Sequence, residues 1–508
     1  MSKERKQSTE VAVREIRRRT RRKFSPNMNS DAGDKGLTFV LAALALSCRL
    51  DQYARGGMIR DKVFRASRVS TTAFLGLATA LALGCATASE RAAVAQLDDW
   101  LARKPLEQSK SVLPSEAGLA DFERLAFENS PILRAAYERW RSQVSAIALV
   151  RALPDPTLGL GIFAREVETR VGPQQARFAF EQRIPWLSKL TLAGDVRALA
   201  AQAAFAEAES LRLELRVRIR SIWGELYYLG KRIDITSDNV ELVRQWEQSA
   251  RARYQSSLLS YRDIARAQIE LGILEDDLAR LHLRRRPLIT RLLAIIGADL
   301  RSPVSIPKEL QEIEPLPDDA ELRTRLQQFN PELTALSHLA DSARIDVARA
   351  RTRYLPDFRV GLAYTLTGSA DMPGVSGSGK DAVVPQLSFS VPIWWGAYAA
   401  GVESAAASQR AANEGVRGQR LVLEAELEDD LFSLRDAQRR QVLYHDDILP
   451  KARENLESTT ASYRSGRAAL IDLIDAQRTL LEFELAFERA RTDAFIAAAK
   501  VRALIGGA

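Results

Sequence analysis

Cysteine and histidine are scarce in this chain of 508 residues, which holds two cysteines and three histidines. His282, His338 and His445 lie far apart, and no cysteine or histidine stands at the spacing of a zinc site. We therefore predict that the chain is not an enzyme and that it has no catalytic residues, no bound metal and no cofactor. With Cys85 acylated, as argued below, no disulfide is possible either, so stability must come from packing.

Long apolar runs are also missing near the N-terminus. The run Ala73 to Leu83 is too short to span a bilayer as a helix. It follows a basic stretch that begins at Met58, and it ends at a small residue, Gly84, which is the order of a signal peptide. We predict that residues 58–84 are a lipoprotein signal peptide and that residues 1–57 are a non-structural extension, or lie upstream of the true start.

Positive charge is concentrated in this N-terminal part. Residues 1–84 hold 17 of the 73 Lys and Arg but only 7 of the 65 Asp and Glu, which leaves 56 basic and 58 acidic residues from Cys85 onward. The cluster Arg17 to Lys23 is compatible with a nucleic-acid-binding arm. A targeting segment accounts for it more simply, and the remainder is nearly neutral, so we expect no nucleic-acid partner.

The sequence Leu81-Ala-Leu-Gly-Cys85 resembles a bacterial lipobox. In such a site the cysteine becomes the mature N-terminus and carries a diacylglycerol, with palmitate as a typical acyl chain. Cys48, after the apolar run Phe39 to Ser47, is a second candidate, and an incidental cysteine is the alternative. Cys85 lies nearer the folded region, so we predict lipidation there, with residues 85–115 as a lipidated linker.

The rest of the chain contains an internal duplication with an offset of 209 residues. Tyr254 to Gln268 aligns with Tyr463 to Gln477 without a gap, and Ala294 to Gly297 aligns with Ala503 to Gly506. The duplication predicts two repeats, residues 116–300 and 318–508, joined by a linker over 301–317. Within each repeat, the period of the apolar residues predicts the order helix, strand, strand, very long helix, turn, helix. Shorter motifs recur at similar offsets: Asn129-Ser-Pro and Asn330-Pro, Leu153-Pro-Asp155 and Leu355-Pro-Asp357, Ile184-Pro185 and Val391-Pro392.

Each repeat has two segments in which apolar residues alternate with small or polar ones. Runs of about ten residues with this period suit tilted strands of a membrane β-barrel. The connections 166–176 and 367–382 are polar and contain glycine, and we predict that they are extracellular loops. Trp186, Trp394 and Trp395 follow the strands and fit an aromatic belt at the membrane interface, although core packing also explains each one alone. The alternating apolar residues are Leu158, Leu160, Ile162, Phe178 and Phe180, then Phe358, Val360, Leu362, Tyr364, Leu366, Leu387, Phe389 and Val391.

Two further segments, residues 189–253 and 396–463, are predicted to be helices of about 100 Å at a rise of about 1.5 Å per residue. Leu211, Leu215 and Ile219 step along the first at coiled-coil spacing. A soluble coiled-coil hairpin would leave the four alternating strands unexplained. Four strands cannot close a barrel in lipid, so several chains must pool their strands. Three chains give twelve strands and an aqueous pore in a cyclic trimer.

Over residues 116–508, these duplicated motifs in this order resemble the TolC family of outer-membrane efflux proteins. The resemblance implies a mixed α/β membrane protein: a homotrimer with a 12-stranded β-barrel and a 12-helix periplasmic α-barrel. It implies a lipid-anchored protein of the outer membrane of a Gram-negative bacterium, extending into the periplasm. The implied partners are outer-membrane lipid, a periplasmic adaptor (membrane-fusion) protein and an inner-membrane pump.

The resemblance also places the turns of two helical hairpins at the periplasmic tip, where the adaptor docks and the pore opens. Asp263 and Asp472 either only cap helix N-termini or, in three copies, form acidic rings at the closed tip. Independently of the family, Ser260 with Asp263 fits a capping box, and Gly466 fits a left-handed helix end. Ser257 stands where the second repeat has Gly466. The predicted tip residues are Tyr254, Ser257, Arg262, Asp263, Gln268, Tyr463, Gly466, Asp472 and Gln477.

The expected function is the passive exit duct of a tripartite efflux pump, with metal cations or drugs as substrates. The segment Ile184 to Leu190 resembles cation-efflux members of the family, which favours a pump of the resistance-nodulation-division type. Two alternatives remain at this point. One is the exit duct of a type I protein-secretion system, and the other is a non-conducting structural lipoprotein that spans the periplasm.

Overall fold

The computed structural model describes residues 86–103, 117–256 and 260–507, except for the side chain of Glu166. The described residues belong to one compact unit, Cys85–Ala508. Cys48, Cys85 and Ser257, together with the predicted signal peptide, lie outside them. The lipidation site and one tip residue therefore stay predictions.

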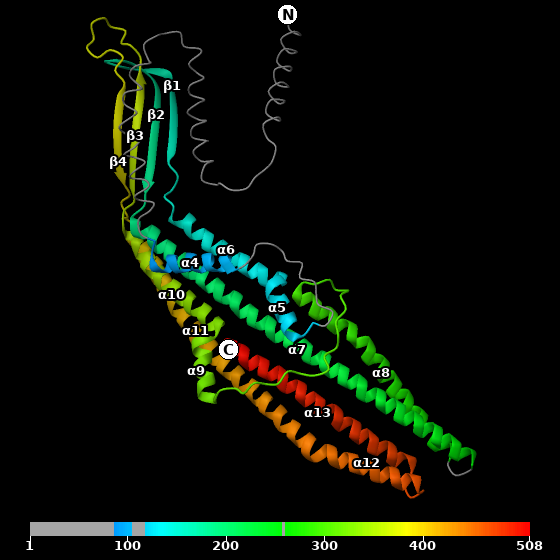
Figure 1. Ribbon diagram of the computed structural model, residues 1–508. Helices are drawn as coiled ribbons and strands as arrows, with labels where there is room; N and C mark the ends of the chain where they lie inside the picture. The colour runs from blue at the N-terminus through cyan, green and yellow to red at the C-terminus, as the bar shows by residue number, and fades with distance from the viewer. Residues whose placement is uncertain (1–85, 104–116, 257–259, 508) are drawn as a thin grey trace, which may run out of the picture. The chain divides into compact units, whose positions relative to one another are not determined.

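The two repeats have the predicted order of elements (Figure 1). A short helix, α4 (Ala88–Arg103), precedes them. The first repeat comprises α5 (Leu119–Asn129), α6 (Pro131–Arg151), β1 (Thr157–Thr169), β2 (Gly172–Ile184), α7 (Leu187–Gln255) and α8 (Tyr261–Ile296). The second comprises α9 (Asp319–Phe329), α10 (Pro331–Arg351), η2 (Thr352–Tyr354), β3 (Phe358–Thr367), β4 (Ala382–Phe389), α11 (Trp395–Val442), the π-helical η3 (Leu443–Ile448), α12 (Leu449–Arg464) and α13 (Leu470–Leu504).

The repeated Asn-Pro motif begins a helix in the second repeat. Asn330 Oδ1 accepts hydrogen bonds from the backbone N–H groups of Glu332 at 2.9 Å and Leu333 at 3.1 Å. Pro331 occupies the first turn, where its missing N–H costs nothing. In the first repeat Pro131 likewise follows the N-cap residue Ser130. The motif thus fixes where the second helix of each repeat starts.

The four strands form one antiparallel sheet in the order β1-β2-β3-β4. The pairing of β2 with β3 joins the two repeats: Phe180 lies opposite Leu362, and Ile184 lies opposite Phe358. β1 and β4 each have a partner on one side only among the described strands. The sheet is therefore open at both edges within one chain.

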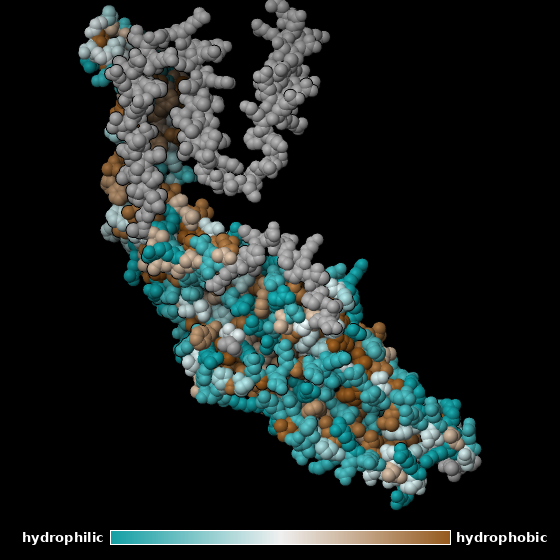
Figure 2. All heavy atoms as spheres, in the orientation of Figure 1, coloured by the Kyte–Doolittle hydropathy of each residue, from teal (hydrophilic) through white to brown (hydrophobic). Residues whose placement is uncertain are grey.

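The two faces of the sheet differ in polarity. Opposite residues share a face, so the register places Leu158, Phe180 and Leu362 in one row and Thr157, Glu181 and Gly361 in another. The apolar row is exposed, with 83% of Leu158 accessible. In Figure 2 brown residues are visible along the sheet where grey atoms do not cover it, whereas the helices present a mainly teal surface. This pattern, apolar on one face and small or polar on the other, is the one that a lipid-facing barrel wall requires.

Both predicted ends of the first loop were wrong. The predicted loop 166–176 is mostly strand, because β1 continues to Thr169 and β2 begins at Gly172, with a tight turn between them. Strand pairing persists through this polar stretch, which the alternation of apolar residues alone could not reveal. Between β3 and β4, by contrast, the predicted connection is a long loop from Gly368 to Asp381.

The long helices also differ from the prediction in one respect. α7 is continuous over 69 residues, which is about 100 Å. The second predicted helix, 396–463, is interrupted by the π-helical η3, and Pro450 follows in the first turn of α12. A proline within a helix removes one backbone hydrogen bond, and the wider turn before it accommodates the ring. Among the described helices, none is both long enough and apolar enough to cross a membrane.

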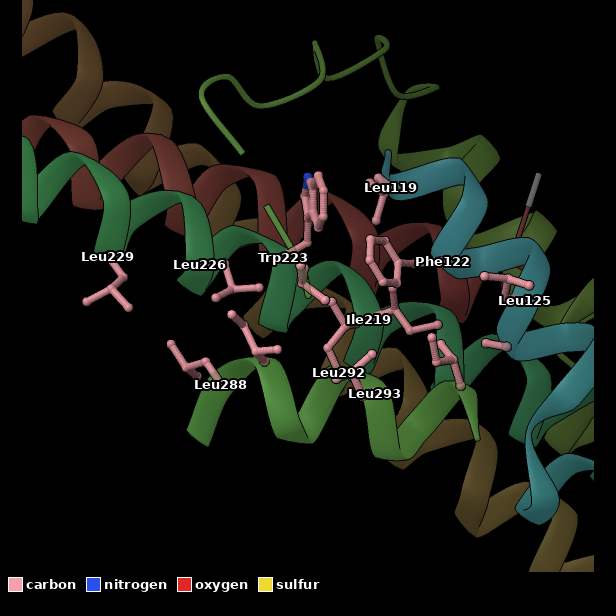
Figure 3. Close-up of a cluster of buried hydrophobic side chains, with 14 of the residues drawn as sticks. Leu119, Phe122, Leu125, Ile219, Trp223, Leu226, Leu229, Leu288, Leu292 and Leu293 are labelled. Carbon is pink, nitrogen blue, oxygen red and sulfur yellow. The ribbon is translucent and has the colours of Figure 1, made fainter. Parts of the chain in front are cut away.

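The largest core cluster joins α5 to the long hairpin of α7 and α8 (Figure 3). Leu119, Phe122 and Leu125 of α5 point toward α7 and α8, and the Phe122 ring lies 5.5 Å from that of Trp223. On α7 the cluster includes Ile219, Trp223, Leu226 and Leu229, and on α8 it includes Leu281, Leu288, Ile289, Leu292, Leu293 and Ile296. Burial of these side chains, at roughly 25 cal/mol per Å² of apolar surface, holds the short helix on the hairpin.

Candidate functional site

The candidate site is formed by the ends of the two helical hairpins, α7–α8 and α12–α13. Their turn regions pack together in a small apolar cluster. Ala250 and Ile264 come from the first hairpin, and Leu470, Leu473 and Ile474 come from the second. The sequence-predicted tips of the two repeats are thus brought together within one chain.

Tyr463 is the centre of this contact. Its side chain is 5% exposed, and the guanidinium of Arg253 lies over its ring at 4.7 Å from the centroid. Arg253 Nη1 also donates a hydrogen bond to the Tyr463 carbonyl oxygen at 3.2 Å. Burial raises the pKa of Tyr463, Arg253 opposes this shift, and the nearby carboxylate of Asp263 adds to it. Arg253, which the sequence did not single out, links the two hairpins.

Asp263 and Asp472 both cap helices. Asp263 Oδ2 accepts from the backbone N–H of Ser260 at 3.2 Å and from its hydroxyl at 2.7 Å. Asp472 Oδ2 accepts from the backbone N–H of Ala469 at 2.9 Å. Each carboxylate satisfies a donor at a helix N-terminus, which is the simpler of the two roles that the sequence left open. The acidic ring in a trimer remains a prediction.

Gly466 makes the turn of the second hairpin. Its φ of +74° lies in the left-handed region, and no atom lies within 4 Å of where a Cβ would be. The residue is therefore needed for its backbone conformation and not for close approach.

Gln268 and Gln477, equivalent in the two repeats, both reach α7. Gln268 Nε2 donates to Glu247 Oε1 at 2.9 Å, and Arg251 donates to the same oxygen at 2.7 Å. The hydrogen bonds from Arg251 and Gln268 lower the pKa of the buried Glu247. Gln477 is 6% exposed and donates to Asn239 Oδ1.

A further ion pair crosses between the hairpins. Glu270 of α8 is 5% exposed and accepts from Arg478 Nε of α13 at 3.0 Å. The Glu270 carboxylate is buried, but the Arg478 side chain is 52% exposed, so the pair is partly screened by solvent. The repeated motifs do not include Asn239, Glu247, Glu270 or Arg478, so the sequence did not single them out.

Two predicted tip residues take no part in these contacts. Tyr254 is 44% exposed and lies edge-on to Tyr261, with ring centroids 6.3 Å apart. Arg262 is exposed at the start of α8. Both are exposed at the first tip, and their role in adaptor docking remains a prediction.

The predicted interface aromatics lie at one end of the sheet, where β2 and β4 both finish. Trp186 stacks on Phe358, with ring centroids 5.9 Å apart. Trp394 and Trp395 are 70% and 69% exposed. Trp394 and Trp395 are therefore not packed in the core of this chain, and their place at the membrane interface stays a prediction.

The Leu-Pro-Asp motif of the second repeat ties this end of the sheet to α7. Asp357 accepts hydrogen bonds at 2.7 Å from both Arg183 Nη2 and Lys189 Nζ. Burial opposes ionisation of Asp357, but these two bonds outweigh it and lower the pKa of the carboxyl. Lys189 stands in the first turn of α7, so this ion pair fixes the angle at which the long helix leaves the sheet.

Within the described residues, no group of three or more His, Cys, Asp or Glu side chains is placed to hold a metal ion.

Comparison with known proteins agrees with this geometry. Residues 322–507 match the family described as outer membrane efflux protein. The chain is 22% identical over 428 residues to the cobalt-zinc-cadmium resistance protein CzcC of Cupriavidus metallidurans, covering 84% of this chain and 98% of that protein. Its fold is similar to the outer membrane protein VceC of Vibrio cholerae, with a TM-score of 0.64, 19% identity, and 77% and 96% of the two chains covered. It is also similar to CusC, with a TM-score of 0.67, 14% identity, and 79% and 96% covered.

The open sheet, the helical hairpins and these matches show that the fold is that of TolC-like outer-membrane channels. Residues 322–507, within the second repeat, match the outer membrane efflux protein family, and a relative aligned over 84% of the chain is 22% identical. The resemblance seen in the sequence is thereby confirmed, as is the function of an outer-membrane efflux channel. Members of this family form trimeric channels of the Gram-negative outer membrane that work with adaptor proteins and inner-membrane pumps.

Proposed function

We propose that three copies of this chain form the exit duct of a metal-cation efflux pump, closed at its periplasmic end by the two hairpin tips. The observation that carries the proposal is the open sheet, in which β1 and β4 each leave one edge without a strand. Unpaired backbone groups are not tolerated in lipid. Three copies supply twelve strands, enough to enclose an aqueous pore with the small and polar face inward.

The helices support the same closure. α7 lies between α8 and α13, and α13 in turn contacts α11 and α12 (Figure 1). The helices therefore form one layer with α8 at one free edge and α11 and α12 at the other. Both edges carry exposed apolar side chains: Ile269, Ile273 and Leu283 on α8, and Phe432 and Val442 on α11. A cyclic trimer brings the α8 edge of one copy against the α11–α12 edge of the next and removes these side chains from water.

The gate lies where Arg253 covers Tyr463. Opening of the duct requires the two hairpins of each chain to separate at their ends, and this contact, with the Glu270–Arg478 pair behind it, resists separation. An adaptor that binds the exposed face of the first tip, at Tyr254 and Arg262, would act next to these contacts. Energy comes from the inner-membrane pump, for which we favour the resistance-nodulation-division type.

Metal cations are the substrate class that we propose. The relative of Cupriavidus metallidurans is named for resistance to cobalt, zinc and cadmium, and the alignment covers 98% of it. The segment Ile184 to Leu190 also resembles cation-efflux members of the family. Lys189 within this segment makes the ion pair with Asp357. Drugs are the second candidate.

A lipid anchor on Cys85 completes the proposal. The nearest described residues hold the chain on α7 and α6. The hydroxyls of Thr87 and Ser89 both donate to Asp195 of α7, and the buried Glu90 pairs with Arg151 of α6. Incorporation of labelled palmitate into wild type and its absence from Cys85→Ser would test the anchor. Retained labelling of Cys85→Ser would point to Cys48.

The substrate is tested by tolerance of a strain that lacks this chain. We expect sensitivity to Co²⁺, Zn²⁺ or Cd²⁺ that the wild-type gene restores. A variant with Glu270→Ala and Arg478→Ala removes both partners of the ion pair behind the gate. It tests whether this pair helps to keep the duct closed. Sensitivity to organic drugs alone would contradict the metal assignment, and loss of a secreted protein without any sensitivity would favour protein secretion.

A further inference from the structure

The C-terminal half of α8 carries arginines without acidic partners. Arg284, Arg286 and Arg291 are exposed, and among the described residues no carboxylate oxygen lies within 4 Å of their guanidinium groups. Elsewhere on the same hairpin, arginines are paired: Arg232 with Asp277 at 2.9 Å, and Arg244 with Glu275 at 2.7 Å. Together with Arg285, which is also exposed and, within the described part of the chain, donates only to the Val304 carbonyl oxygen at 3.5 Å, these arginines form a local excess of positive charge.

These arginines flank the free edge of α8. The buried side chains Leu281 and Leu288 point toward α7, and helical periodicity places Leu283 and Pro287 on the opposite side. Leu283 is 76% exposed. Arg286 is partly held by a hydrogen bond at 2.8 Å to the Leu300 carbonyl oxygen, which restricts where its charge can lie.

The opposite free edge carries a matching acidic group. Asp446 and Asp447 lie in η3, are exposed, and follow Val442, which is 61% exposed at the end of α11. Asp446 contacts only its neighbour His445, at 2.7 Å, in the ion pairs and hydrogen bonds of the described residues, and Asp447 contacts none there. Val442 beside two carboxylates on this edge therefore corresponds to Leu283 beside arginines on α8.

The two groups stand at the same level of the helical layer. Leu288 of α8 and Leu226 of α7 share one core cluster. One residue further along α7, the Tyr227 hydroxyl donates to Glu488 of α13 at 2.6 Å. Beside that position on α13, Gln441 of α11 donates to the Ala490 carbonyl oxygen at 3.1 Å. These contacts, taken in turn from α8 to α7, α13 and α11, place the arginines of α8 and the carboxylates of η3 at the same height along the helices.

The π-helical turn explains why both carboxylates face outward. A π-helical turn inserts residues into the regular periodicity and rotates the side chains that follow it. Leu449 and Ala452 after the turn remain buried against α13, while Asp446 and Asp447 within it stay exposed. The first repeat has Ser237 and Asp238 at the equivalent positions, in regular helix within α7.

We propose that Arg284 and Arg286 of one copy pair with Asp446 and Asp447 of the next copy, around a contact of Leu283 with Val442. The partner of this surface is a second copy of the same chain, and the inference rests on the trimeric duct proposed above. Complementary charges on the two edges fix the level at which neighbouring copies meet, and they reject shifted pairings. The π-helical turn thus belongs to the joint between copies and not to the gate.

Charge reversal tests this pairing. The variants Arg284→Glu/Arg286→Glu and Asp446→Arg/Asp447→Arg each place like charges at the joint, so we expect the detergent-solubilised trimer to dissociate at a lower temperature than wild type. The combination of all four substitutions restores opposite charges and should recover the wild-type dissociation temperature. Arg344→Glu/Arg349→Glu on α10, which lies between α7 and α11, is the control and should leave dissociation unchanged.

A trimer that tolerates both reversals, or that the fourfold variant fails to restore, would overturn the inference while leaving the duct intact. The absence of any trimer in wild type would instead contradict the proposed function itself.

Cysteine cross-linking provides a second test that does not depend on stability. Leu283→Cys with Val442→Cys should give covalent dimers and trimers under mild oxidation. Ile269→Cys with Val442→Cys is the control, because residue 269 lies four turns of α8 away, roughly 20 Å at 1.5 Å per residue. Equal cross-linking of both pairs, or cross-linking of the control alone, would show that the copies meet at another level.

Discussion

The two hairpin tips are built from equivalent residues but lie in different surroundings. Tyr254 and Tyr463 are separated by the repeat offset of 209, yet the first is 44% exposed and the second is 5% exposed. The difference arises from residues that the duplication did not preserve. Arg253 covers Tyr463, whereas the residue equivalent to Arg253 in the second repeat is Ser462, which is too short to cover Tyr254.

The same asymmetry runs along α7. Asn239 and Glu247 receive the hydrogen bonds of Gln477 and Gln268. Their equivalents in the second repeat are apolar, Ile448 and Leu456. α7 lies between α8 and α13, so it is the helix to which both tips are attached. The two hairpins are thus joined through residues of α7 that have no polar equivalent in the second repeat.

The largest expected difference between the tips concerns the two tyrosines. Tyr463→Ala removes a buried ring, and we expect a loss of about 3–5 kcal/mol in the local stability of the second tip, the range found for large aromatic residues in cores. Tyr254→Ala removes an exposed ring and should cost no more than about 0.5 kcal/mol. Native-state hydrogen exchange of the amides in the two turns measures both. Equal losses would show that the comparison is mistaken.

A smaller difference is expected at glycine. Gly466→Ala forces an alanine into a left-handed conformation, and we expect a loss of about 1–2 kcal/mol. Gly272 on α8 is the matched control, because its Cβ position is also empty but its backbone is helical. Gly272→Ala should stabilise the first hairpin by about 0.5–1 kcal/mol. Thermal unfolding shows whether each variant is destabilised or stabilised. An unchanged stability of Gly466→Ala would contradict the role given to the turn.

The smallest expected effect depends on pH and sharpens the comparison of Gln268 with Gln477. The pKa of Glu247 is lowered in the folded protein, so its contribution to stability is present above the ordinary glutamate pKa of about 4.3 and is lost as pH falls through the lowered value. Protection of the α7–α8 hairpin against hydrogen exchange should therefore be constant from pH 7 to pH 5 and decrease in more acidic solution.

Glu247→Gln is the control for this effect, because it keeps a hydrogen-bond acceptor and removes the charge. It should abolish the part of the pH dependence that comes from this contact. The contact of Gln477 with Asn239 involves no titrating group and should not respond. A decrease in protection already between pH 7 and pH 5 would assign the sensitivity to another residue.

The sequence predicted the fold well because the duplication and the two periodicities report backbone structure directly. Alternation at Leu158, Leu160 and Ile162 identified a strand, and spacing at Leu211, Leu215 and Ile219 identified a helix. The boundaries that failed, at Thr169 and in η3, lie where polar residues continue a strand or where a proline requires a wider turn. Neither departure changes the apolar pattern that was followed.

The candidate site was predicted only in part. Repeated residues such as Tyr463 and Asp472 could be found by aligning the chain with itself. Arg253 and Asn239 could not, because they contact the motifs from positions where the two repeats differ. The signal that would have found them is a charged or polar residue in one repeat at a position where the other repeat has neither.

The measurement that tests the account most directly is the single-channel conductance of the purified trimer in planar bilayers. We expect a small conductance for wild type, and a several-fold larger one for Arg253→Ala, because the cover over Tyr463 is lost. Arg262→Ala, an exposed arginine of the same tip, should behave as wild type, and Asp263→Ala/Asp472→Ala shows whether the acidic residues also constrict the pore. Equal conductance of wild type and Arg253→Ala would move the gate away from the tips, and no conductance from an assembled trimer would contradict the exit duct.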